Sequence, residues 1–284
     1  MTDNPLAGKI RRYFFEETDP VRLDAFRVSL GLAMFFYFFS ISRGWSVAGE
    51  WLTNRGFHVS GTLLPSMPVA SLLPVSWLPW FGALFFASLI LWILGFHPRT
   101  LGCLVLGLVS YVSFADVLSN YSVNRLFMIG LAVLCCARRG SSQTVWPIRI
   151  LQMVLVLQYF MAGWAKVFYG DWLRDPLTLW SQLQVYYMNG FCAWVLPKVP
   201  LKAWSAMQYG TLLFELSAPF LFFIRKLRPV GLICGAVFHL IIALLMQDLI
   251  YFGLQMMSFY VLFVPEAALH KIRVYKRLSV LLDF

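Results

Sequence analysis

Lys166 stands near the end of a long apolar run, in the stretch Tyr159-Phe160-Met161-Ala162-Gly163-Trp164-Ala165-Lys166. Gln158, Ala162 and Lys166 are four residues apart, so a helix places them on one face. The small residues between them would let a second helix come close. A lysine withdrawn from water there would suit a base or a nucleophile. The alternative is a side chain that extends to lipid headgroups.

Glu215 and His239 are two further ionisable residues within apolar runs. Glu215 comes ten residues before Arg225, and His239 comes eleven residues after Arg228, on either side of a short basic turn. At 1.5 Å per residue, both lie about 15 Å from that turn. We therefore expect the two side chains to hydrogen-bond across a helix interface. The pair would be either a polar clamp between helices or a proton relay below a cavity.

The other polar residues point to no familiar enzyme. The sequence lacks a P-loop, a Rossmann fingerprint, a GxSxG motif and an HExxH motif. Its five cysteines show neither CxxC nor Cys/His spacing, so we expect no metal. Asp116 follows an apolar run close to Asn120, and we interpret this region as a polar rim.

Composition predicts the elements that must position these residues. Hydrophobic residues make up 60% of the chain and charged residues only 13%, and the mean hydropathy is +0.72. Apolar runs of about 20 residues match the length that crosses a bilayer. We predict an all-α, polytopic integral membrane bundle of about eight transmembrane helices. The predicted spans are residues 23–42, 77–96, 100–117, 119–137, 146–168, 203–224, 229–247 and 250–266, of which the fourth is the weakest.

The charges predict an orientation. The net charge is +10, and the basic clusters Arg138-Arg139 and Arg225-Lys226-Arg228 fall on one side only if the number of spans is even. By the positive-inside rule, that side is the cytoplasm. We therefore expect one transmembrane domain over residues 1–284, with both termini inside and basic tails at residues 1–22 and 267–284. The same charges are better explained by topology than by nucleic-acid binding.

Two long segments would cover the outer face, at residues 43–76 and 169–202. In the second, Asp175-Pro176 is typical of a helix start and Asn189-Gly190 of a helix stop. We expect a short helix between them, lying on the outer membrane surface.

Three segments resemble the HTTM (horizontally transferred transmembrane) family, whose membrane domain is shared with vitamin K-dependent gamma-carboxylases. They are residues 19–27, the stretch 159–166 with Gly170-Asp171-Trp172, and the set Phe214-Glu215, Pro219, Phe238-His239-Leu240 and 252–263. The resemblance implies that Lys166 is a base that deprotonates a reduced quinone, of the vitamin K or menaquinone type. It also places His239 in the active region. We expect Glu215 to assist them, and Tyr159, Gln158 and Trp172 to contact the cofactor.

The sequence departs from the carboxylases at two positions. Ala165 stands where they have a second lysine, and Asp175 stands where a glycine is expected. The residues given include no counterpart of their large lumenal domain. We therefore expect a related chemistry rather than glutamate carboxylation, or a substrate that a partner protein delivers.

Two functions follow as hypotheses. The first is a quinol-linked or peptide-modifying membrane enzyme with an outward-facing lysine-based site, in the cell membrane of a bacterium (the inner membrane). The alternative is a non-enzymatic membrane partner for the maturation of, or immunity to, a secreted peptide toxin. The expected partners are the lipid bilayer, a quinone and a secreted peptide or protein, with no nucleic acid. A transporter is a weaker third possibility, because inverted repeats are not visible.

Overall fold

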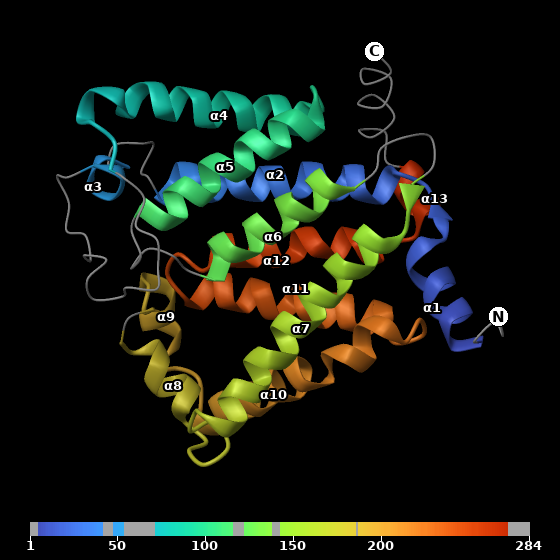
Figure 1. Ribbon diagram of the computed structural model, residues 1–284. Coiled ribbons are helices and arrows are strands. Elements are labelled where there is room, and N and C mark those ends of the chain that lie inside the picture. Colours follow the sequence, from blue (N-terminus) through green and yellow to red (C-terminus); the bar gives the residue numbers. More distant parts are fainter. Residues whose placement is uncertain are drawn as a thin grey trace. The chain divides into compact units, whose positions relative to one another are not determined.

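The computed structural model describes residues 5–41, 48–53, 72–115, 122–137, 143–185 and 187–271, and these residues are largely helical (Figure 1). The all-α prediction is confirmed, since the strands in this part of the chain are only β1 (Glu17–Thr18) and β2 (Gln143–Thr144), which pair antiparallel. The chain divides into two compact units. One comprises Met1–Arg149 with Val264–Phe284, and the other comprises Ile150–Phe263. The expectation of a single domain stays a prediction.

The first unit is built mainly from four long helices. Its helical elements are α1 (Pro5–Phe15), α2 (Val21–Ile41), α3 (Ala48–Leu52), η1 (Val75–Trp77), α4 (Leu78–Leu94), α5 (Pro98–Ala115), α6 (Ser122–Cys136) and α13 (Glu266–His270). Helix α2 packs against α4, α6 and α13, while α5 packs against α4 and α6. The buried surfaces are mostly aromatic and aliphatic, as a bundle interior requires.

The residues at the two ends of α4 explain why this helix begins and ends where it does. Pro79 lies in the first turn, where a missing N–H costs nothing. Gly95 ends the helix at a φ of 91°, and its N–H reaches the carbonyls of Leu91 and Trp92. Glycine suits this left-handed position because it has no Cβ to clash. The turn leads directly into α5.

The second unit holds the remaining helices. They are α7 (Trp146–Phe168), which begins in the first unit, α8 (Thr178–Leu183), α9 (Gly190–Val195), α10 (Leu201–Phe223), α11 (Arg228–Leu245), α12 (Ile250–Tyr260) and η2 (Val261–Phe263). Helix α11 packs against both α10 and α12. The short helix α8 packs against α10, and α9 packs against α11.

The segment 169–202 carries the expected helix after Asp175-Pro176, but the interpretation of Asn189-Gly190 as a helix stop was wrong. Asn189 is the N-cap of α9, and its Oδ1 accepts a hydrogen bond of 2.8 Å from the N–H of Cys192. Its Nδ2 also donates to the carbonyl of Leu244 at 2.9 Å. A short polar side chain before a glycine serves either end of a helix, so the dipeptide alone did not choose between them.

The other expected outer segment, 43–76, falls largely outside the described residues. The described parts hold α3 and η1, and the N–H of Leu73 donates to the carbonyl of Leu52 at 2.8 Å. The expected polar rim at Asp116 and Asn120 also lies outside the described residues.

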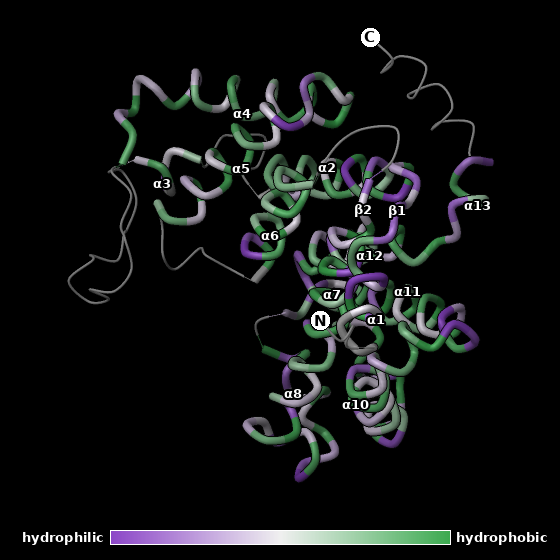
Figure 2. Tube along the Cα trace, turned by 45° about the vertical axis from the view of Figure 1, so that its right-hand side comes forward, coloured by the Kyte–Doolittle hydropathy of each residue, from purple (hydrophilic) through white to green (hydrophobic). Residues whose placement is uncertain are grey.

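Five described helical segments are long and apolar enough to cross a membrane, so this is a multi-pass membrane protein. They are Val21–Ser40, Val75–Leu94, Pro98–Ala115, Trp146–Phe168 and Arg228–Leu245. Figure 2 shows hydrophobic residues along most helices and hydrophilic residues near their ends. Helix α10 has sufficient length, but Gln208 and Glu215 lower its mean hydropathy. The count of about eight spans and the orientation stay predictions.

Candidate functional site

Lys166 lies in the last turn of α7 and forms an ion pair with Glu215 of α10. The side chain of Lys166 is 25% exposed and that of Glu215 only 4%, so one partner reaches an open space and the other is sealed. Gly163 lets the helices meet here, because a Cβ on it would lie 2.9 Å from the Cβ of Glu215. The small residue that the sequence singled out thus faces the ion pair directly.

The expected hydrogen bond between Glu215 and His239 does not form. Their neighbours Phe214 and Phe238 face each other instead, with ring centroids 5.4 Å apart. A step of one residue turns a helix by 100°, so Glu215 and His239 both point to other partners. The expectation was wrong because the distance from the turn sets the depth of a residue but not the direction in which it points.

His239 takes part in a buried chain of hydrogen bonds with two tyrosines. Its Nε2 lies 2.6 Å from the hydroxyl of Tyr159, which in turn lies 2.6 Å from the hydroxyl of Tyr260 on α12. All three side chains are buried. The ring of Phe222 stacks on Tyr159 at 5.9 Å, with an angle of 11° between the planes. Helices α7, α11 and α12 therefore meet at the hydroxyl group of Tyr159, and α10 packs on its ring.

Two buried polar atoms at this site are left without a hydrogen-bond partner among the described residues. They are Oε2 of Glu215 and Nδ1 of His239. A buried polar atom without a partner costs about 1–3 kcal/mol, so such atoms are few in folded proteins. Both are therefore places where a substrate or a water molecule would complete the hydrogen bonding.

Trp172 follows α7 and lies beside the lysine, whose Nζ is 4.9 Å from the ring centroid. The buried side chain of Gln208 on α10 holds this segment in place. Its Nε2 donates to the carbonyls of Trp172 and Asp175, both at 2.7 Å, and its Oε1 accepts from the N–H of Leu179 at 2.9 Å. Sequence reasoning missed Gln208, although a glutamine within a mostly apolar helix is a usable signal.

The three predicted cofactor contacts, Tyr159, Gln158 and Trp172, lie in different surroundings. Tyr159 lies in the hydrogen-bonded chain and Trp172 lies beside Lys166. Gln158 is half-buried and makes no hydrogen bond to any residue that the structure describes. Tyr260 was also missed, because a lone tyrosine in an apolar helix has no distinctive spacing.

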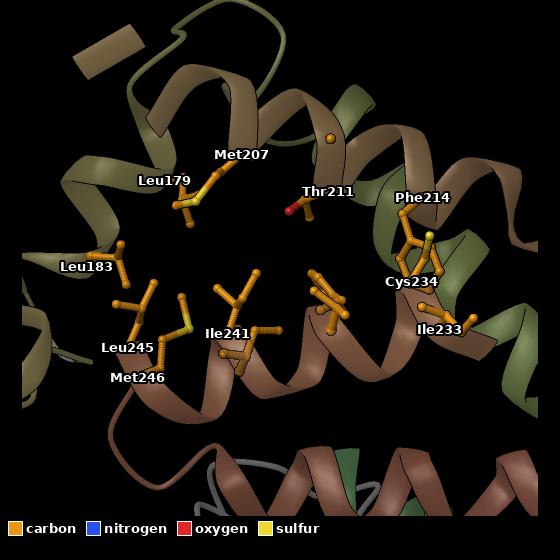
Figure 3. Close-up of a pocket in the computed structure, with 14 residues that line it drawn as sticks. Leu179, Leu183, Met207, Thr211, Phe214, Ile233, Cys234, Ile241, Leu245 and Met246 are labelled. Carbon is orange, nitrogen blue, oxygen red and sulfur yellow. The ribbon is translucent and has the colours of Figure 1, made fainter. Parts of the chain in front are cut away.

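An apolar cavity of about 340 Å³ lies between α10 and α11 (Figure 3). Figure 3 shows Leu183 of α8 toward one end and Phe214 toward the other, and Phe238 is also among the lining residues. These two phenylalanines also contact the polar chain, since Phe214 lies 5.1 Å from the ring of Tyr159 and Phe238 lies 5.2 Å from that of His239. The remaining lining is aliphatic apart from Thr211, Cys234 and two methionines. The cavity would accept a hydrocarbon chain.

Other chemistry finds less support in the described residues. No three His, Cys, Asp or Glu side chains gather there as a metal site would require. Burial raises the pKa of the Cys192 thiol in α9, which keeps it protonated and a poor nucleophile. The Lys166–Glu215 pair instead places an ammonium group in direct contact with a buried carboxylate.

A comparison with known protein families found a match over the part of the chain that contains these residues. Residues 132–267 match the family model of the HTTM domain, which confirms the HTTM resemblance over that part of the chain. The matched segment includes Lys166, Glu215, His239 and Tyr159. Searches of curated proteins and of solved structures gave no match to this chain.

Proposed function

We propose that this protein is a membrane enzyme that removes a proton from a lipid-soluble quinol or a secreted peptide. The observation that carries the proposal is the Lys166–Glu215 ion pair, which is open on the lysine side and sealed on the glutamate side. An ionisable pair within membrane helices is costly and is usually kept for a function. The HTTM match covers both residues.

The pair can accept a proton in two steps that keep the charge balanced. Glu215 takes a proton from the Lys166 ammonium, which leaves a neutral carboxyl group and a neutral amine. The amine then takes the proton of the substrate. Burial of Glu215 brings the neutral pair closer in free energy to the ion pair, because two neutral groups lose less solvation on burial than two charged groups. The proton passes to Oε1 of Glu215, the oxygen that the Lys166 ammonium contacts, and Oε2 stays available to accept a further hydrogen bond.

The described residues fit a quinol. When bound, a quinol supplies an acidic hydroxyl group and two electrons. The apolar cavity offers room for part of an isoprenoid tail, and the polar chain of Tyr159, Tyr260 and His239 lies just beyond its inner end. The unpaired Nδ1 of His239 is available to a hydroxyl group. This support is chemical complementarity, and it leaves the particular quinone open.

Quinol oxidation in lipid nanodiscs tests the proposal. A short-chain menaquinol is supplied in aerated buffer and its oxidation is followed by absorbance. We expect discs with the protein to oxidise it faster than empty discs. We expect Lys166→Met to lower the protein-dependent rate of quinol oxidation by about 10²-fold or more, which is the usual size of a general-base contribution. Equal rates with and without protein, or an unchanged rate in an inserted Lys166→Met variant, would overturn the proposal.

Lys198→Met is a matched control. Lys198 lies between α9 and α10, is exposed, and lies 3.4 Å from the ring centroid of Trp194. It therefore shares the cation–aromatic contact of Lys166 but has no ion pair among the described residues. The control should oxidise quinol at the wild-type rate. An equal loss of quinol oxidation in both variants would mean that removing any lysine in this region lowers the rate, and that Lys166 has no special role.

A partner role for a secreted peptide is the second candidate. Large apolar side chains are exposed in the segment between α7 and α10, among them Tyr169, Val185 and Trp194. Such groups suit a protein contact as well as a lipid interface. Co-purification of a stable partner that persists in Lys166→Met would favour this role over catalysis.

We also propose the finer topology: about eight spans, both termini in the cytoplasm, and a location in a bacterial inner membrane. The basic clusters support it. Fusions of alkaline phosphatase and of a fluorescent protein after residue 226 and after residue 284 would both report the cytoplasm. Opposite reports from these two sites would require an odd number of spans between them.

A further inference from the structure

Helix α1 is a basic helix near the N-terminus. It contains Lys9, Arg11 and Arg12 but no acidic residue. At 100° per residue, Ile10, Tyr13 and Phe14 fall on one side, and the three cations fall on the opposite side and its flanks, where Phe15 at the end of the helix also lies. The cations are exposed, and Ile10 on the apolar side is 51% exposed. The protein therefore leaves both sides of this helix largely uncovered.

The position of α1 in the chain keeps it close to a bilayer. Five residues separate its end at Phe15 from the start of α2 at Val21, and five residues span at most about 17 Å. Helix α2 includes the candidate membrane span Val21–Ser40. The connecting residues are also held, since β1 pairs with β2 and the N–H of Val145 donates to the carbonyl of Glu16 at 2.9 Å. A membrane surface is thus always within reach of α1.

One contact orients the helix within its own unit. The guanidinium carbon of Arg149 lies 4.6 Å from the ring centroid of Tyr13. This contact anchors α1 near the start of α7 and leaves Lys9, Arg11 and Arg12 free of that interface. A basic amphipathic helix with an uncovered apolar side matches the interface of a bilayer, where lipid chains meet charged headgroups.

We propose that α1 lies on the bilayer surface and binds the headgroups of anionic phospholipids through Lys9, Arg11 and Arg12. Ile10 and Phe14 enter the boundary of the lipid chains. Each cation near an anionic membrane surface strengthens binding by about fivefold, so three of them give on the order of a hundredfold. The attraction depends on salt because it acts between exposed charges. This inference is independent of the catalytic proposal.

Proteolysis of the full-length protein in nanodiscs tests it. Chymotrypsin cuts at the aromatic residues of α1, and mass spectrometry follows the released N-terminal peptide. We expect cleavage to be slower in discs that contain phosphatidylglycerol than in discs of phosphatidylcholine alone. Salt at about 1 M, where the Debye length is roughly 3 Å, should remove the difference. Equal cleavage in both lipids, or protection that salt does not change, would overturn the proposal.

Substitutions distinguish headgroup binding by the cations of α1 from an effect of the protein's net positive charge. Lys9→Gln with Arg11→Gln and Arg12→Gln should make cleavage equal in the two lipids. Arg225→Gln with Lys226→Gln removes two exposed cations from the turn between α10 and α11 and should leave the lipid effect intact. If the triple variant proves unstable, the salt titration of the wild-type protein decides alone.

Discussion

Arg27 in the first unit and Lys166 in the second are two helix cations that are held in different ways. Arg27 of α2 is 1% exposed, and its Nη1 donates to the backbone carbonyls of Trp92 and Ile93. Those carbonyls belong to the C-terminal turn of α4, where the helix dipole favours a positive charge. Lys166 of α7 is partly open and pairs with the carboxylate of Glu215.

The partners explain why the two charges serve different purposes. The backbone carbonyls that Arg27 contacts are too weakly basic to take a proton, and guanidinium does not lose its proton in proteins. The carboxylate of Asp24 lies farther off, at 3.6 Å. Lys166 instead meets a carboxylate that keeps one oxygen unpaired. A charge in a membrane helix is therefore structural or functional according to its partner and its access, and not by its presence alone.

The largest effect on stability should come from Arg27→Met. It removes the cation that holds the end of α4 to α2, and we expect a loss of about 3–5 kcal/mol, as for other broken buried charge contacts. Thermal unfolding in detergent, followed by fluorescence size exclusion, measures it. Arg22→Gln is the control, because the Arg22–Glu266 ion pair is partly exposed and worth at most about 1 kcal/mol. A small effect of Arg27→Met would remove the contrast between the two cations.

Next in size is Glu215→Leu, which leaves the ammonium of Lys166 without its partner. We expect a loss of about 2–3 kcal/mol. Lys166→Met added to it should recover most of that loss, because an apolar pair of similar size replaces an ion pair well. A double-mutant cycle by thermal unfolding gives the coupling. Additive losses would mean that the two residues do not form an energetic pair.

Gln208→Leu should cost about 2 kcal/mol, because two carbonyls and one N–H lose their partner. Hydrogen–deuterium exchange should then rise at Leu179 and around Trp172, and remain unchanged in the first unit. Gln208→Glu tests the donors separately: it replaces the amide that donates to both carbonyls with an acceptor. The result tests whether the position of Lys166 depends on a fixed Trp172, as the position of Arg27 depends on the end of α4.

The smallest effect, about 1 kcal/mol, is expected for Tyr260→Phe, which removes one hydroxyl from the chain to Tyr159 and His239. Gly235 provides a second observation, because a Cβ there would collide with the hydroxyl of Tyr260. Gly235→Ala should therefore destabilise the wild-type protein more than it destabilises Tyr260→Phe. An equal cost in both backgrounds would contradict the packing at this point.

Part of the site could be predicted from the sequence. Helical spacing marked Lys166 and the small residues on its face, and Gly163 does lie against Glu215. Burial of ionisable residues in apolar runs marked Glu215 and His239. Gln208 and Tyr260 were not found, because their roles depend on groups far away in the chain that no local spacing reveals.

The sequence by itself determined that this is a multi-pass helical membrane protein, since apolar runs and few charges leave a chain no other way to satisfy its backbone in lipid. It also determined which residues could do chemistry. Only the tertiary structure decided which of them meet: Glu215 turned to Lys166, His239 to Tyr159, and Asn189 to the start of a helix. The physical reason is that helix rotation and packing, which depend on the whole bundle, set the direction of each side chain, whereas sequence spacing sets only its depth and its face.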